Sequence, residues 1–137
     1  MSGTFTAEFR CLEDICAFAG RAAQQCGFSE DDVYHVQIAV DEAFSNIIEH
    51  ALEGAQGQEV ECTCTVSDTA LTITLSDYGK SFNPEEVPGP LLDRSLHERE
   101  KGGLGLFFIR HWMDEVHFES SAARNVLVMV KRKEPSR

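Results

Sequence analysis

An apolar stripe along residues 33–51 constrains the fold of this chain more than any other feature. Its members recur at helical spacing, and Ser29 precedes them as a favourable N-cap, with Asp32 as a weaker capping-box partner three residues later. A helix with one apolar face has to bury that face against another element. The sequence therefore predicts a long amphipathic helix that ends near Leu52. The stripe consists of Val33, Val36, Val40, Phe44, Ile47, Ile48 and Ala51.

A second helix and several strands supply the surface on which we expect the stripe to pack. Residues 12–26 repeat apolar side chains at helical spacing and stop at Gly27. Residues 59–66 and 70–76 are rich in Thr and apolar residues, and the short turn between them predicts an antiparallel hairpin. This order predicts an α/β two-layer sandwich, in which helices cover one face of a mixed, mostly antiparallel sheet. The other expected elements are a strand from Thr4 to Phe9, a helix from Leu104 to Met113, and strands from Glu115 to Glu119 and from Val126 to Lys131.

Length and charge narrow the class of protein. The 137 residues suit a single domain over residues 1–137. A formal net charge of -11 argues against a nucleic acid partner, because phosphate contacts need clustered Lys and Arg. No apolar run approaches the roughly 20 residues of a membrane span, and no signal peptide is visible, so we expect no membrane association and a cytoplasmic location. The 5 cysteines include no Cys-x-x-Cys pair, and we expect small buried hydrophobes rather than disulfides or a metal site.

The first candidate site residues interrupt the apolar stripe of the long helix. Glu42 and Asn46 are four residues apart, so their side chains project from the same helix face. Because burying an unpaired carboxylate is costly, such a position needs solvent, a partner or a ligand. A solvent-facing pair at the edge of the stripe and a ligand-binding pair both satisfy this requirement.

A second candidate lies where the hairpin ends. Asp77 closes the second strand, and a carboxylate there can accept a hydrogen bond from an amino group of a ligand. Gly79 follows and lets such a ligand approach the backbone closely. Ordinary turn chemistry is the alternative, since Asp-x-Gly is a common way to leave a strand.

A third candidate is the glycine-rich segment from Lys101 to Leu106. Glycines leave the backbone uncovered, and an apolar run with helical spacing follows at once, which is typical of a loop that leads into a helix. The free N–H groups and the dipole at such a helix start attract phosphate. Residues 78–101 hold several prolines and mixed charges and show little periodicity, which predicts a long loop of the kind that is usually functional or mobile.

The three segments, read in order, are similar to the N, G1 and G2 boxes of the GHKL ATPase superfamily. They are Asp41-Glu42-Ala43-Phe44-Ser45-Asn46, Ser76-Asp77-Tyr78-Gly79-Lys80-Ser81-Phe82-Asn83-Pro84 and Lys101-Gly102-Gly103-Leu104-Gly105-Leu106. Their order and spacing most resemble the small serine/threonine protein kinases that act as anti-sigma factors. The resemblance covers almost the whole chain and implies the GHKL, or histidine-kinase-like, ATPase fold.

The resemblance also implies a role for each candidate residue. Glu42 would act as the general base, and Asn46 would coordinate Mg²⁺. Asp77 and Gly79 would bind the adenine of ATP, with Phe82 as part of the pocket wall. In an ATP lid over residues 80–102, Arg99 and Lys101 would lie near the β- and γ-phosphates. The backbone N–H groups that would cradle the phosphates belong to Gly102, Gly103, Leu104, Gly105 and Leu106.

Proteins of the resembled group are partner switches. They bind a sigma factor in one state, and in another they phosphorylate a small antagonist of the STAS class. The resemblance therefore implies a STAS-domain substrate, a possible sigma-factor partner and a homodimer. Two alternatives remain at this stage: a GHKL module that binds ATP without transferring phosphate, and a histidine-kinase-like ATPase domain.

Overall fold

The computed structural model describes residues 1–51, 58–79, 105–121 and 124–133. The helical elements are a short 3-10 turn at Phe9–Cys11, α1 at Leu12–Cys26, α2 at Glu30–Asn46, a π-helical turn at Ile47–Ala51, and α4 at Gly105–Trp112. The strands are β1 at Ser2–Thr6, β2 at Glu59–Val66, β3 at Ala70–Asp77, β4 at Glu115–Ser120 and β5 at Asn125–Arg132.

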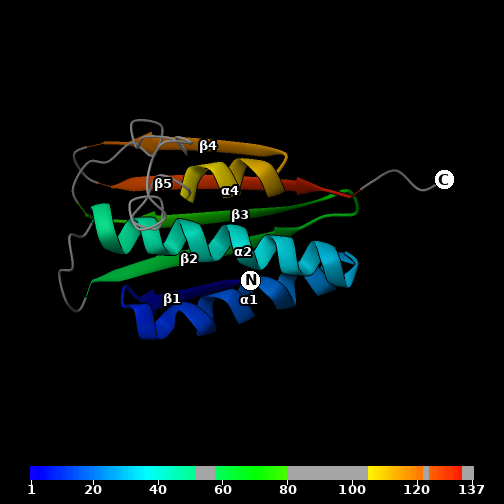
Figure 1. Ribbon diagram of the computed structural model, residues 1–137, viewed down its shortest axis with the longest axis horizontal. Helices are drawn as coiled ribbons and strands as arrows, with labels where there is room; N and C mark the ends of the chain where they lie inside the picture. The colour runs from blue at the N-terminus through cyan, green and yellow to red at the C-terminus, as the bar shows by residue number, and fades with distance from the viewer. Residues whose placement is uncertain (52–57, 80–104, 122–123, 134–137) are drawn as a thin grey trace, which may run out of the picture.

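The five strands form one sheet in the order β1-β2-β3-β5-β4. Every pairing between these described strands is antiparallel. The helices α1, α2 and α4 lie on one face of the sheet, with α2 between α1 and α4 (Figure 1). The predicted α/β two-layer sandwich is therefore confirmed, with a sheet that is antiparallel throughout the described strands rather than mixed.

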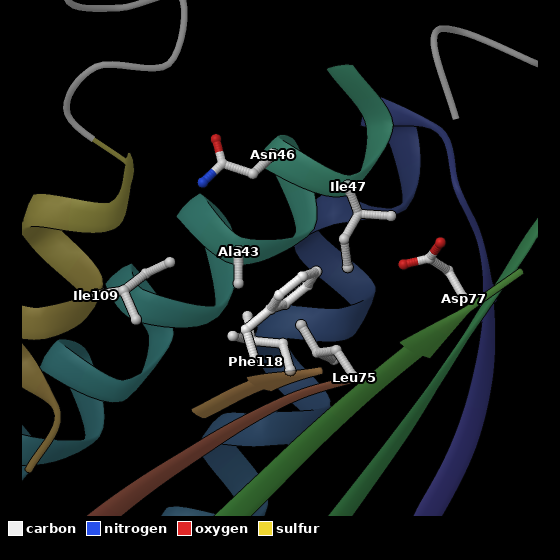
Figure 2. A pocket seen from close by; sticks show the side chains of 8 residues that line it. Ala43, Asn46, Ile47, Leu75, Asp77, Ile109 and Phe118 are labelled. Atoms are coloured by element: carbon white, nitrogen blue, oxygen red, sulfur yellow. The ribbon is translucent and has the colours of Figure 1, made fainter. Parts of the chain in front are cut away.

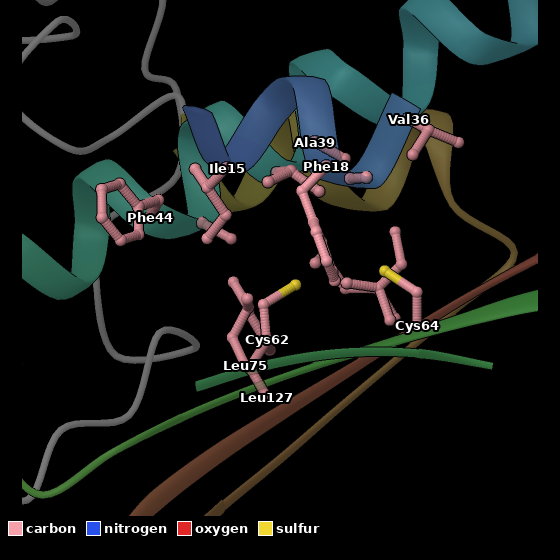
Figure 3. Packing of buried hydrophobic residues seen from close by; sticks show 14 of the residues in the cluster. Ile15, Phe18, Val36, Ala39, Phe44, Cys62, Cys64, Leu75 and Leu127 are labelled. Carbon is pink, nitrogen blue, oxygen red and sulfur yellow. The ribbon is translucent and has the colours of Figure 1, made fainter. Parts of the chain in front are cut away.

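The core lies between the helices and the sheet. Alternate residues of β2 are buried up to Cys64, and the same alternation continues on β3 through Leu71, Ile73 and Leu75. In Figure 3 the strand side chains, with the two thiols of Cys62 and Cys64 among them, face the apolar residues of α1 and α2. These cysteines are thus core residues, as predicted, and all five cysteines of the chain are free thiols.

Helix ends agree with the local sequence signals. Gly27 adopts a left-handed backbone conformation with φ 91° and ends α1 at the predicted residue. The backbone N–H of Asp32 donates to Ser29 Oγ at 3.2 Å, which is the expected N-cap of α2. The end of α2 is an exception: a helix to near Leu52 was predicted, but the regular α-helix stops at Asn46 and the next residues, Ile47–Ala51, form the π-helical turn.

The first strand differs from the prediction. We expected Thr4 to Phe9, but β1 spans Ser2–Thr6 because its register follows its pairing with β2, which ends at Thr6 opposite Glu59. Beyond that pair the chain turns, since Glu8 N donates to Thr6 O at 2.8 Å and Cys11 N donates to Glu8 O at 2.9 Å. Phe9 consequently lies in the 3-10 turn and is 52% exposed.

None of the helices in the described part of the chain is long and apolar enough to cross a membrane.

The left-handed conformation of Gly27 gives a stability prediction. Gly27→Ala should lower the free energy of unfolding by about 1–2 kcal/mol, because a Cβ is strained at this φ. Gly27→Asn should lose less, since Asn tolerates the left-handed region better than Ala. Urea unfolding of the three proteins measures both values. Equal losses for Ala and Asn would contradict the strain explanation.

Candidate nucleotide-binding site

One small pocket lies between the helical layer and the sheet, where α2, α4 and the strands meet (Figure 2). Its free volume is about 10 Å³, close to the space that one water molecule needs. Most of the described lining residues are apolar, and among them only Asn46 and Asp77 contribute polar side chains. An apolar pocket with few polar groups is typical of a small-molecule site, and its side chains must move apart to admit a base. The lining consists of Ala43, Asn46, Ile47, Leu75, Asp77, Ile109, Phe118 and Leu127.

Asp77 is the one charged residue among the described lining residues of this pocket, and it is 2% exposed. It is the last residue of β3, where the strand ends at the pocket. Its Oδ1 accepts a hydrogen bond from the backbone N–H of Gly79 at 2.8 Å and one from Asn125 Nδ2 at 3.0 Å. These two donors compensate part of the cost of burying the carboxylate.

Asn46 lies across the pocket from Asp77. It is the last residue of α2 and is 4% exposed. In Figure 2 its side chain lies toward α4, Asp77 lies at the end of β3, and Ile47 is between them. The sequence left open the alternative that Asn46 faces solvent, and this alternative is therefore wrong. Its burial on the pocket wall favours the ligand-binding alternative.

Glu42 lies one helical turn before Asn46 and is partly buried. Burial raises the pKa of its carboxyl group above the usual value, and the neighbouring charges of Asp41 and Glu49 raise it further. Burial also raises the pKa of Asp41, while a hydrogen bond from Ser45 Oγ at 3.5 Å opposes that shift. A carboxylate with a raised pKa is a better proton acceptor, as a general base requires.

The structure places only some of the predicted site residues. It brings Asn46 and Asp77 to one pocket. The backbone N–H of Gly79 donates a hydrogen bond to Asp77, and Glu42 lies one helical turn from Asn46. Gly105 and Leu106 begin α4, close to the predicted helix start. The remaining predicted residues lie outside the described part of the chain: Phe82, Arg99, Lys101, Gly102, Gly103 and Leu104.

Sequence reasoning missed one polar residue of the site, Asn125. It is 2% exposed, begins β5 and faces Asp77 in the sheet register. The chain separates the two residues by 48 positions, so their contact depends on β3 and β5 being neighbours. A polar residue at the start of an apolar strand was the only local signal.

Comparisons with known proteins agree with this architecture. The histidine kinase-like ATPase domain model matches residues 5–131. The chain is 33% identical over 102 residues to the serine-protein kinase RsbW of Bacillus licheniformis. This alignment covers 71% of this chain and 63% of that protein. It is 31% identical over 108 residues to RsbW of Bacillus velezensis, covering 76% of this chain and 68% of that protein. The aligned part thus spans about two thirds of the length of these relatives.

A solved structure shows the same fold. The RsbU and RsbW domains of a Mycobacterium tuberculosis protein superpose with a TM-score of 0.64 at 15% identity, covering 100% of this chain and 33% of that one. The chain therefore belongs to the histidine kinase-like ATPase domain family, and it is similar to the RsbW serine-protein kinases.

The raised pKa of Glu42 predicts how stability depends on pH. Above the ordinary pKa of 4.5 the folded state holds this proton more tightly than the unfolded state, so stability falls as pH rises through the window up to the folded pKa. Glu42→Gln removes that loss. We expect the Tm of the Glu42→Gln variant to exceed the Tm of the wild-type protein at about pH 7. The two Tm values should converge near pH 4. Thermal unfolding by circular dichroism across this range measures the difference, and parallel profiles would contradict it.

Proposed function

We propose that this chain is an ATP-dependent serine/threonine protein kinase of the anti-sigma-factor type. The observation that carries the proposal is the buried carboxylate of Asp77 at one side of an apolar pocket whose other polar wall is Asn46. The names of its relatives, which are serine-protein kinases, support the class of activity.

The pocket suits an adenine base. A planar, largely apolar ring matches an apolar lining, and its exocyclic amino group needs an acceptor at the edge. Asp77 offers a carboxylate oxygen there. Since the described cavity holds about 10 Å³, binding requires side chains such as Ile47 and Phe118 to move.

Asn46 fits the requirements of a Mg²⁺ ligand. Its side chain is buried on the pocket wall and is one of two polar side chains among the described lining residues. Mg²⁺ prefers oxygen ligands and takes few from the protein, completing its shell with water and nucleotide phosphates. When bound, the ion would neutralise phosphate charge, and Asn46 would hold it through its amide oxygen.

Glu42 would take the proton of the substrate hydroxyl. The hydroxyl oxygen forms a bond to the γ-phosphorus, the bond from that phosphorus to the β,γ-bridging oxygen breaks, and ADP leaves. The raised pKa of Glu42 makes it a suitable acceptor for this proton. Most of the rate would come from positioning and charge neutralisation, as in other phosphoryl transfers.

The proposed substrate is a small antagonist protein of the STAS class, phosphorylated on Ser or Thr. A sigma factor is the proposed partner in the other state of the switch, and the kinase is proposed to act as a homodimer. These partners rest on the resemblance to anti-sigma kinases.

The adenine role of Asp77 can be tested by substitution. Asp77→Asn offers a donor where an acceptor is needed and leaves a buried amide mispaired, at a cost of roughly 1–3 kcal/mol. ATP affinity measured by calorimetry should fall about tenfold or more. Asp68→Asn makes the same chemical change in the exposed turn between β2 and β3 and should leave the affinity unchanged. Unchanged affinity in Asp77→Asn would remove the adenine role.

A second experiment separates binding from chemistry. Glu42→Gln should retain Mg·ATP binding but lose phosphoryl transfer by on the order of 10²-fold or more. Asn46→Ala should instead weaken the dependence of ATP binding on Mg²⁺. The measurements are calorimetry with and without the metal, and the appearance of alkali-labile phosphate on a small copurified partner. A normal transfer rate in Glu42→Gln would place the base elsewhere and favour a binding module without transfer.

A further inference from the structure

A line of hydrogen bonds crosses three strands and ends at Asp77. In the sheet register Asp77 of β3 faces Asn125 of β5, and Asn125 faces Ser120 of β4. Ser120 Oγ donates to Asn125 Oδ1 at 2.6 Å, and Asn125 Nδ2 donates to Asp77 Oδ1 at 3.0 Å. Asn125 is buried, whereas Ser120 is exposed. Asp77, Asn125 and Ser120 thus form a row of hydrogen-bonded side chains that connects the surface at β4 to the buried carboxylate. Figure 1 shows the three strands that the row crosses, β3, β5 and β4, side by side in the sheet.

The two neighbours of Asn125 fix the orientation of its amide. The Asp77 carboxylate accepts, so it requires the NH₂ end of the amide, and the Ser120 hydroxyl donates to the oxygen end. Turning the amide over would place its oxygen against a carboxylate oxygen, and both atoms are acceptors. Asn125 therefore has one favourable orientation in this row.

The orientation of Asn125 in turn fixes the carboxylate of Asp77. Its amide and the backbone N–H of Gly79 both donate to the same oxygen, Oδ1. Two donors on one oxygen resist rotation of the carboxylate. In the described part of the chain neither bond uses Oδ2, so that oxygen is left for a ligand in the pocket that Asp77 lines. Holding a binding group in place through its neighbours is how a site is preorganised.

We infer that Asn125 is a positioning residue which, oriented by Ser120, holds Asp77 ready to accept the amino group at position 6 of a purine. The inference rests on the proposed function, because it takes the pocket as the base site. It adds a source of specificity. A fixed acceptor favours a 6-amino purine over a 6-oxo purine, whose oxygen is itself an acceptor.

Comparing ATP with inosine triphosphate tests the inference, because the two differ at position 6 of the base. In the unchanged protein ATP should bind at least about tenfold more tightly, since the oxo group leaves Asp77 mispaired. Asn125→Ala should weaken ATP binding about tenfold and inosine triphosphate binding much less. The ratio of the Kd for inosine triphosphate to the Kd for ATP should therefore become smaller. A merely structural role would weaken both nucleotides equally.

Ser120→Ala provides the second variant, because an exposed serine on an edge strand can be truncated with little effect on folding. Ser120→Ala should also lower the ratio of the Kd for inosine triphosphate to the Kd for ATP, by about threefold, as expected for loss of one neutral hydrogen bond. Ser121→Ala is the matched control: its Oγ donates to Arg124 O at 3.3 Å, outside the row, so the ratio should not change. Thermal unfolding of each variant shows whether it is folded.

A double substitution separates failure of this inference from failure of the proposed function. In the Asp77→Asn background, Asn125→Ala should change the ATP to inosine triphosphate ratio no further, because the group it positions is gone. If Asp77→Asn itself leaves ATP affinity unchanged, the adenine site and the inference are both wrong. If Asp77→Asn weakens ATP binding while Asn125→Ala and Ser120→Ala keep the full ratio, only the positioning role is wrong.

Discussion

The packing of α2 against the sheet is the interaction on which the rest of the structure depends. Val36, Val40 and Phe44 are fully buried, and each such side chain contributes about 1.5–3 kcal/mol relative to exposure. This apolar contact fixes the rotation of the helix about its axis. A rotation by one residue, about 100°, would expose the stripe and turn Asn46 away from the pocket. The core therefore determines which polar side chain reaches the pocket.

The register of the sheet provides the second constraint. A buried carboxylate without partners costs several kcal/mol, and part of this cost is compensated for Asp77 because β5 places Asn125 directly opposite it and the backbone N–H of Gly79 donates to it as well. The antiparallel order in which β5 pairs with both β3 and β4 also brings Ser120 into the same row. One register thus satisfies the carboxylate and orients it, so stability and recognition depend on the same hydrogen bonds.

Local signals predicted the end of α1 and the start of α2 better than most strand ends, whereas the end of α2 was predicted too late. The roles of Gly27 and Ser29 can be predicted from the sequence, because a left-handed helix end and an N-cap depend on a few adjacent residues. Strand ends depend on distant partners, and β3, β4 and β5 each extend beyond the predicted bounds, as β3 does to Asp77 opposite Asn125. For the site, Glu42, Asn46 and Asp77 came from motifs, whereas Asn125 required the strand order. The four-residue spacing of Glu42 and Asn46 predicts that they share one helix face. It could not show that Asn46 is buried on the pocket wall while Glu42 is only partly buried.

The charges near the proposed reaction centre explain why such a site needs a cation. Glu42 lies beside Asp41 and Glu49, and their charges, with burial, raise its pKa because each additional negative charge is unfavourable there. A triphosphate brings further negative charge to a chain of net charge -11. Repulsion of this kind favours a neutral metal ligand over another carboxylate next to the proposed base, and Asn46 would supply an oxygen without adding charge. In the proposed mechanism, the same field that would make Glu42 a better proton acceptor would therefore make phosphate binding depend on a divalent ion.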